Sequence, residues 1–149
     1  MNQKKLLPPV FLFSAMLLMA ALHVLLPLAE IVAYPWLLLG SLPLLLGIAI
    51  NLSADRAFKT FNTTVKPYEE SSTLITSGVF RYTRHPMYLG MIFILLGLSI
   101  LMGSLTPFFV IPAFALVMEK RFIAMEETML AQKFGATWTD YKSKVRKWI

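Results

Sequence analysis

The sequence predicts an all-α integral membrane protein with about four transmembrane helices and an interfacial amphipathic helix at the C-terminal end. Of the 149 residues, 57% are hydrophobic and 15% are charged, whereas a soluble domain is about 45–50% apolar. The apolar residues form long blocks rather than an amphipathic pattern, and basic residues flank these blocks. The length fits one domain, so we expect a single membrane domain over residues 1–149.

The first two apolar blocks cover residues 8–29 and 34–52. The first block is long enough to cross a hydrocarbon layer of about 30 Å, and its only polar side chains are Ser14 and His23. We expect His23 to form a hydrogen bond with another helix, because polar groups within a membrane pair with one another. The short connection, residues 30–33, predicts that the two helices form an antiparallel pair.

Residues 53–86 are expected to form a polar loop that mixes charged and aromatic side chains, with residues 55–61 as an alternative extension of the second helix. We interpret this loop as part of a ligand site at the membrane surface. The third and fourth apolar blocks, residues 87–102 and 107–122, follow it and are joined by four uncharged residues. Both blocks are short for a full crossing. They are expected to cross with tilt and local thinning of the bilayer, or to form a helical hairpin.

The polar tail, residues 123–149, carries an amphipathic pattern near its end. Its aromatic side chains Trp138, Tyr141 and Trp148 share a helical face, opposite several lysines. Such a pattern is typical of a helix that lies in the headgroup layer. With four crossings, all 14 Lys and Arg fall on one side and Glu30 alone lies on the other. The positive-inside rule then places both termini in the cytoplasm, with the protein in the inner membrane if the cell is bacterial.

Composition excludes several function classes. The chain contains no cysteine, so disulfides, thiolate nucleophiles and cysteine-based zinc sites are excluded, and no metal site is expected. The net charge of +6 is attributed to basic residues that meet anionic lipid headgroups. Membrane lipids are therefore the expected partners of these residues, and nucleic acid is not.

Two clusters carry the candidate chemistry. In the first, Arg84 and His85 precede Pro86, which suits the first turn of a helix. The two side chains then lie at a helix N-terminus, where free N–H groups favour an anion. The second cluster, Glu126 and Glu127, follows the fourth apolar block, so a hairpin would bring it to the same corner. The alternative is that the arginine reaches lipid phosphates and the histidine caps the helix.

The segment Arg84-His85-Pro86-Met87-Tyr88-Leu89-Gly90, followed by an apolar hairpin and Glu126-Glu127, resembles the RHPxYxG…EE signature of the isoprenylcysteine carboxyl methyltransferase and phospholipid methyltransferase superfamily. The resemblance extends over roughly the C-terminal three fifths of the chain. It implies that S-adenosylmethionine binds from the cytosol and that a lipid-like acceptor enters sideways from the bilayer. It also implies catalytic roles for Arg84 and Glu127. The cofactor-binding residues that it implies are Arg84, His85, Tyr88, Gly90, Glu126 and Glu127.

The resemblance predicts an enzyme that transfers a methyl group from S-adenosylmethionine to a hydrophobic, membrane-borne acceptor, such as an isoprenylcysteine carboxylate or another lipid-like small molecule. N-methylation of a phospholipid amine is an alternative, and it differs because an amine must lose a proton whereas a carboxylate needs no base. An NADPH-dependent membrane reductase and a non-catalytic membrane adaptor are further alternatives. The glycines lack the G-x-G pattern of a Rossmann domain, so the methyl donor is expected to bind at the membrane surface.

Overall fold

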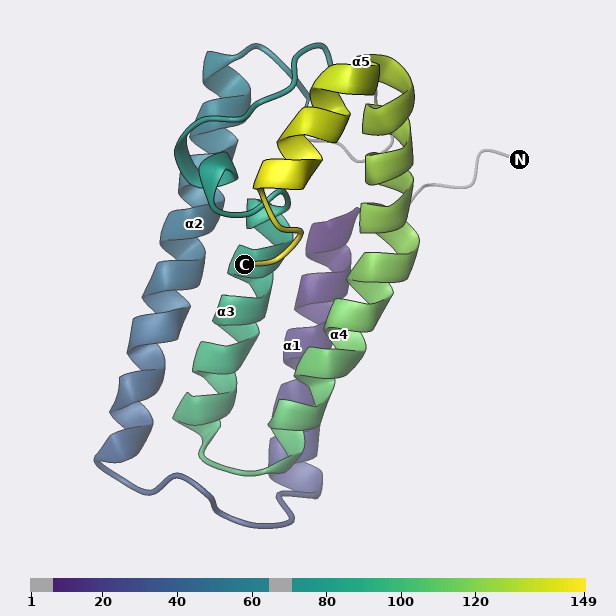
Figure 1. Cartoon of the computed structure of the whole chain (residues 1–149). Helices are drawn as coiled ribbons and strands as arrows, with labels where there is room; N and C mark the ends of the chain where they lie inside the picture. Colours follow the sequence, from purple (N-terminus) through teal and green to yellow (C-terminus); the bar gives the residue numbers. More distant parts are fainter. Residues whose placement is uncertain (1–6, 65–70) are drawn as a thin grey trace.

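Figure 1 shows the computed structural model, which describes residues 7–64 and 71–149 and in which long helices lie side by side. No strand occurs among these described residues, and the predicted all-α membrane class is confirmed. Residues 65–70 of the expected site loop lie outside the described part. The elements in chain order are α1 (Pro8–Leu25), η1 (Trp36–Gly40), α2 (Ser41–Thr60), η2 (Gly78–Arg81), α3 (Pro86–Met102), η3 (Thr106–Phe109), α4 (Val110–Met118), η4 (Glu119–Ile123) and α5 (Ala124–Lys144).

The first two helices are long and apolar enough to cross a membrane, over Pro8–Leu25 and Trp36–Thr60. Only 17% of each apolar window is buried inside the protein, so most of these side chains face outward, as expected for contact with lipid. The first helix ends at Leu25 rather than at residue 29, because Pro27 disfavours helical geometry in the residue before it. The second ends at Thr60 rather than at residue 52, and an ion pair of 2.6 Å between Lys59 and Asp55 lies in its added turns.

Helix α3 begins at Pro86 and ends before Gly103, close to the predicted range of 87–102. Gly103 adopts a left-handed conformation with φ 75°, which glycine accepts without strain. Near this turn the ring Nδ1 of His23 lies 2.7 Å from the Ser104 hydroxyl. His23 therefore has a hydrogen-bond partner in the bundle, but this partner lies in the turn between α3 and η3 rather than in another helix.

The fourth predicted helix is longer than expected, and residues from 123 onward do not form a separate tail. Helix α4 continues through the π-helical η4 into α5, so that one rod rises along the bundle in Figure 1. The rod breaks at Gly135, whose φ of 48° and ψ of −117° are not helical. After Gly135 the chain turns back over the end of the bundle. The break thus places the last part of α5 above the beginning of α3.

Helices α2 and α3 pack backbone against backbone along a seam of glycines. A Cβ atom added to Gly47 would lie 2.4 Å from the carbonyl oxygen of Gly90, and one added to Gly40 would lie 2.5 Å from that of Gly97. On its other side, α3 contributes Leu95 to a buried core that also contains Met19 of α1. Helix α3 thus packs between α2 and α1, so the first two helices do not form the directly packed antiparallel pair that their short connection predicted.

Candidate active site

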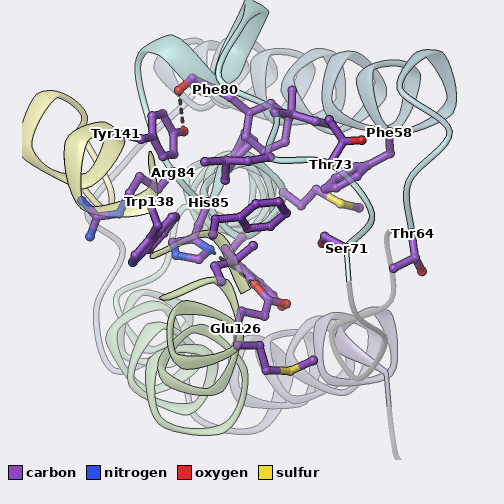
Figure 2. Close-up of a pocket in the computed structure, with 18 of the residues that line it drawn as sticks. Phe58, Thr64, Ser71, Thr73, Phe80, Arg84, His85, Glu126, Trp138 and Tyr141 are labelled. Carbon is purple, nitrogen blue, oxygen red and sulfur yellow. Dashed lines mark hydrogen bonds and ion pairs between the residues drawn. The ribbon is translucent and has the colours of Figure 1, made fainter. Parts of the chain in front are cut away.

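A cavity of about 220 Å³ lies at the end of the bundle where the loop before α3 meets the folded-back part of α5. Figure 2 shows Phe80 and Tyr141 on one side of this cavity and Glu126 on the other. Its charged and polar wall includes Arg84, His85, Tyr88, Glu126 and Lys133. Its apolar and aromatic wall includes Pro8, Phe58, Leu74, Ile75, Phe80, Met87, Met91, Met129, Leu130, Trp138 and Tyr141.

The beginning of α3 positions His85. Pro86 occupies the first helical position, and His85 is the residue before it. The backbone N–H of His85 donates to the Thr83 hydroxyl at 3.2 Å, and only 4% of His85 is exposed. The imidazole is therefore fixed at the helix N-terminus, as the sequence predicted.

The π-helical turn η4 brings two consecutive glutamates to the same histidine. This turn buries both Phe122 and Ile123, which a regular α-helix would direct about 100° apart. One turn later, Glu126 Oε2 lies 3.4 Å from Nδ1 of His85, and Glu127 Oε1 lies 3.3 Å from Nε2. The two glutamates thus lie on either side of the imidazole, and the predicted meeting of the two clusters is confirmed.

Tyr88 lies one turn inside α3 and connects the corner formed by His85 and Glu126, the histidine corner, to the hydrophobic core. Its hydroxyl donates to Glu126 Oε1 at 2.5 Å. Its ring stacks on Phe122 with a centroid distance of 6.2 Å. Tyr88 therefore fixes the direction of the Glu126 carboxylate, which lies on the cavity wall.

Arg84 and Glu127 form a buried ion pair behind the histidine. The Nε and Nη2 atoms of Arg84 donate to Glu127 Oε1 at 2.9 and 2.7 Å. The side chains of the two residues are 6% and 13% exposed. The guanidinium also lies 5.8 Å from the ring of Trp138, within the range of a cation–π contact. Most of the hydrogen-bonding capacity of Arg84 is thus directed at the protein.

The charges of the site support one another. Burial lowers the pKa of His85, but hydrogen bonds to Glu126 and Glu127 and their negative charges outweigh it, so this pKa is raised above 6.5. Burial likewise raises the pKa of Glu127, but hydrogen bonds from His85 and Arg84 outweigh it and lower this pKa to about 2. The imidazole lies between two carboxylates, and these favour its protonated form over the neutral ring.

Two of the predicted cofactor-binding residues lie away from the cavity wall. Gly90 faces α2, where an added Cβ atom would lie 2.8 Å from the carbonyl oxygen of Gly47, so its position is explained by helix packing. Glu127 faces an open groove on the other side of the histidine, together with Lys142 and Lys147. Arg84, His85, Tyr88 and Glu126 do line the cavity.

The structure adds wall residues that the sequence did not assign to the site. Trp138 and Tyr141 belong to the amphipathic face expected to contact lipid, but they are 3% and 7% exposed and pack against protein. The Tyr141 hydroxyl donates to the backbone carbonyl of Phe80 at 2.7 Å (Figure 2). Burial raises the pKa of Tyr141 to about 12, so its hydroxyl keeps this proton. The amphipathic pattern thus identified the correct helical face, but this face packs on protein rather than on lipid.

Comparisons with known proteins agree on one family. The model of the phospholipid methyltransferase family matches residues 35–137. A protein-S-isoprenylcysteine O-methyltransferase of Saccharomyces cerevisiae is 34% identical over 112 residues, which are 72% of this chain and 46% of the relative. Protein-S-isoprenylcysteine O-methyltransferase A of Arabidopsis thaliana is 32% identical over 130 residues, which are 79% of this chain and 64% of the relative. The chain thus spans about half the length of these methyltransferases.

A solved structure shows the same arrangement. The eukaryotic intramembrane Ras methyltransferase, an isoprenylcysteine carboxyl methyltransferase, superimposes with a TM-score of 0.69 and 26% sequence identity. The match covers 95% of this chain and 51% of the larger protein. An uncharacterized protein of Haemophilus influenzae is 40% identical over 63 residues, which are its whole length and 42% of this chain. The likeness therefore covers nearly the whole chain in the longer methyltransferase and less than half of it in the shorter protein.

Proposed function

The chain belongs to the phospholipid methyltransferase family, and from this premise we propose that it transfers a methyl group from S-adenosylmethionine to a hydrophobic acceptor in the membrane. One observation carries the proposal: His85, flanked by Glu126 and Glu127, forms the polar end of an otherwise apolar cavity. A small charged ligand and a lipid-like ligand could meet in such a cavity.

The donor groups on the wall fit the chemistry of S-adenosylmethionine. The N–H donors of His85 and Lys133 suit its carboxylate, and the Glu126 carboxylate suits its ammonium group or ribose hydroxyls. The rings of Trp138 and Tyr141 on the same wall suit a purine and a positively charged sulfur. When bound, this group supplies a methyl carbon activated by a cationic sulfur.

The protein contributes position and exclusion of water. His85 and Glu126 are held by hydrogen bonds to Thr83 and Tyr88, so they present fixed charges to a bound ligand. The folded-back part of α5 covers the cavity with buried aromatic rings. Alignment and removal of water account for much of the rate of a displacement reaction between two bound molecules. The residues of the site would thus act by aligning the two bound molecules and by excluding water.

Two acceptor classes fit the proposal. The names of the relatives favour an isoprenylcysteine-like carboxylate, whose apolar chain would contact the side of the cavity formed by Ile75, Met87 and Met129. The carboxylate of Glu126 on the cavity wall favours the other class, a lipid amine, since it would attract an ammonium group and accept its proton. Supplying both acceptors to the enzyme distinguishes the two classes.

Ligand binding tests the proposal before any acceptor is known. In calorimetry on detergent-purified protein, S-adenosylhomocysteine should bind, and its affinity should fall at least tenfold in His85→Ala and Glu126→Gln, a loss of about 1.4 kcal/mol. Lys144→Ala is the matched control, since Lys144 pairs with Asp140 in an exposed position. Binding of NADPH without binding of S-adenosylhomocysteine would replace the methyltransferase by a reductase.

Transfer of a labelled methyl group then identifies the acceptor. We expect label in a farnesylcysteine analogue if the acceptor is a carboxylate, and in phosphatidylethanolamine vesicles if it is an amine. Only the amine reaction requires a base, so its rate should fall in Glu126→Gln even at saturating donor. Absence of labelling in a total lipid extract and in the analogue, despite donor binding, would contradict transfer to a lipid-like acceptor.

A further inference from the structure

We infer that Arg84 and Glu127 are positioning residues, which fasten the C-terminal end of the chain over the cavity and do not touch the methyl donor. The inference rests on the proposed function for the identity of the ligand. Two names are used below: the roof is residues 136–144, the part of α5 after Gly135, and the strap is residues 145–148, which follow it.

The strap is attached to the chain just before α3 by three consecutive carbonyl groups. The backbone carbonyl of Val145 accepts from Nη1 of Arg84 at 2.6 Å, and that of Arg146 accepts from the Arg84 backbone N–H at 3.0 Å. The carbonyl of Lys147 accepts from the Thr83 hydroxyl at 2.9 Å. Such a regular set of bonds between distant parts of the chain indicates a docked segment.

Glu127 orients the guanidinium for this task. It accepts from Nε and Nη2 of Arg84, which directs Nη1 toward the carbonyl of Val145 and, at 3.4 Å, that of Lys142. All three guanidinium nitrogens therefore have protein acceptors, and a carboxylate on the donor would have to compete with them. Glu127 lines the open groove and not the cavity, and Trp138 lines both.

The strap is also fixed at its far end. Nζ of Lys147 lies 2.5 Å from Glu119 Oε1, and Trp148 packs against the core of α1, α3 and α4. Because the roof lies between Gly135 and the strap, fixing the strap also fixes Trp138 and Tyr141 on the cavity wall. Arg84 thus acts on the cavity through the roof.

Two ligands that differ in one chemical group separate this role from direct binding. S-adenosylhomocysteine carries a carboxylate and an ammonium group, whereas methylthioadenosine keeps the adenosine and the thioether sulfur but lacks both. If Arg84 acts through the roof, Arg84→Ala should weaken both ligands by the same factor, about tenfold. A variant that weakened S-adenosylhomocysteine alone, or neither ligand, would overturn the inference.

Lys147→Ala provides a second route to the same result, because it releases the strap without changing any residue of the cavity wall. It should weaken both ligands equally, by a smaller factor than Arg84→Ala. His85→Ala is the contrasting variant, since loss of a direct contact with the carboxylate should weaken S-adenosylhomocysteine more than methylthioadenosine.

Proteolysis tests the strap without any ligand. Trypsin cleavage after Lys147, followed by intact mass, should be several times faster in Arg84→Ala and in Glu127→Gln than in the wild type. Asp140→Asn is the matched control, because Asp140 pairs only with Lys144 among the described ion pairs and is 64% exposed. Unchanged cleavage in Arg84→Ala would refute the strap. If the wild type bound neither ligand, the proposed function would fail while this result still decided the inference.

Discussion

At the scale of single residues, the site depends on the charge of His85. Both ring nitrogens lie within 3.4 Å of a carboxylate oxygen, an arrangement that favours the imidazolium over the neutral ring. Its raised pKa means that this group contributes to stability below pH 6.5 and that the contribution is lost as pH rises through the folded-state pKa. The contribution of Glu127 to stability depends on pH in the opposite direction: it is present above pH 4.5 and is lost as pH falls toward 2.

We therefore expect the stability due to this cluster to be greatest between about pH 4.5 and 6.5. The thermal midpoint of the protein in detergent should decrease above this range as His85 loses its proton. The decrease should begin at lower pH in Glu126→Gln, because removing one carboxylate lowers the pKa of His85. Nitrogen-15 spectra of histidine-labelled protein measure this titration directly, and His23→Asn leaves His85 as the single histidine. A His85 pKa below 6.5 in the wild type would contradict the structure.

The residue types at this corner could be predicted from the sequence, but their individual partners could not. The order Arg84-His85-Pro86 fixed their place at a helix start, and the short hairpin predicted the approach of the glutamate pair. Which glutamate faces the cavity depends on the turn η4, and the sequence of that turn does not distinguish a π-helix from an α-helix. For Arg84 and Glu127, we therefore propose positioning roles, based on their contacts, in place of the predicted catalytic roles.

At the scale of helices, the glycine seam determines how closely α2 and α3 pack. Gly47→Ala should lower the free energy of unfolding by about 3 kcal/mol, because its Cβ atom would overlap the backbone of α3 at Gly90. Chemical unfolding in mixed micelles measures this loss. Helices α2 and α3 must separate to admit the alanine side chain of this variant, so binding of S-adenosylhomocysteine should weaken as well.

Gly78→Ala is the control for this prediction. Unlike Gly47, Gly78 has a positive φ, 61°, and an added Cβ atom there meets no atom within 4 Å. Its cost is limited to the backbone strain of about 1 kcal/mol that a side chain brings to this conformation. Equal losses in the two variants would show that close packing of α2 and α3 does not contribute to stability.

The ends of α3 were predicted well because Pro86 and Gly103 have strong and local conformational preferences. The direction of the chain after Gly135 was not, since an amphipathic face can pack equally well on lipid and on protein. Trp138 and Tyr141 gave the correct helical face, yet their burial depends on a partner that is distant in sequence. Local signals therefore predicted helix positions, and long-range packing determined how the site is covered.

At the scale of the whole molecule, the cavity lies at one end of the bundle and the connection between α1 and α2 at the other (Figure 1). The part of the chain that matches the family model includes α2, α3, α4 and the glutamate pair. The superposition covers nearly the whole chain but half of the larger methyltransferase. The part that matches the family model thus contains Arg84, His85, the hairpin of α3 and α4 and both glutamates, and it ends at the start of the roof.

The location of the cavity at one end of the bundle predicts the orientation of the protein in the membrane. All 14 Lys and Arg fall on the side of the cavity under the four-crossing prediction, so this side should face the cytoplasm. The natural chain contains no cysteine, and single cysteines can therefore report each side. In intact bacterial cells, a membrane-impermeant maleimide should label Ile31→Cys, whose exposed position lies in the connection between α1 and α2. Asp140→Cys in the roof should react only after the membrane is opened.

The opposite labelling pattern would have a chemical consequence for the proposed function. S-adenosylmethionine is charged and soluble, so it does not cross a hydrocarbon layer without a carrier. A cavity that faced away from the cytoplasm would be separated from the compartment in which this donor is made. Labelling of Asp140→Cys from outside intact cells would therefore contradict both the orientation and the use of a cytosolic methyl donor, even if the purified protein bound S-adenosylhomocysteine in detergent.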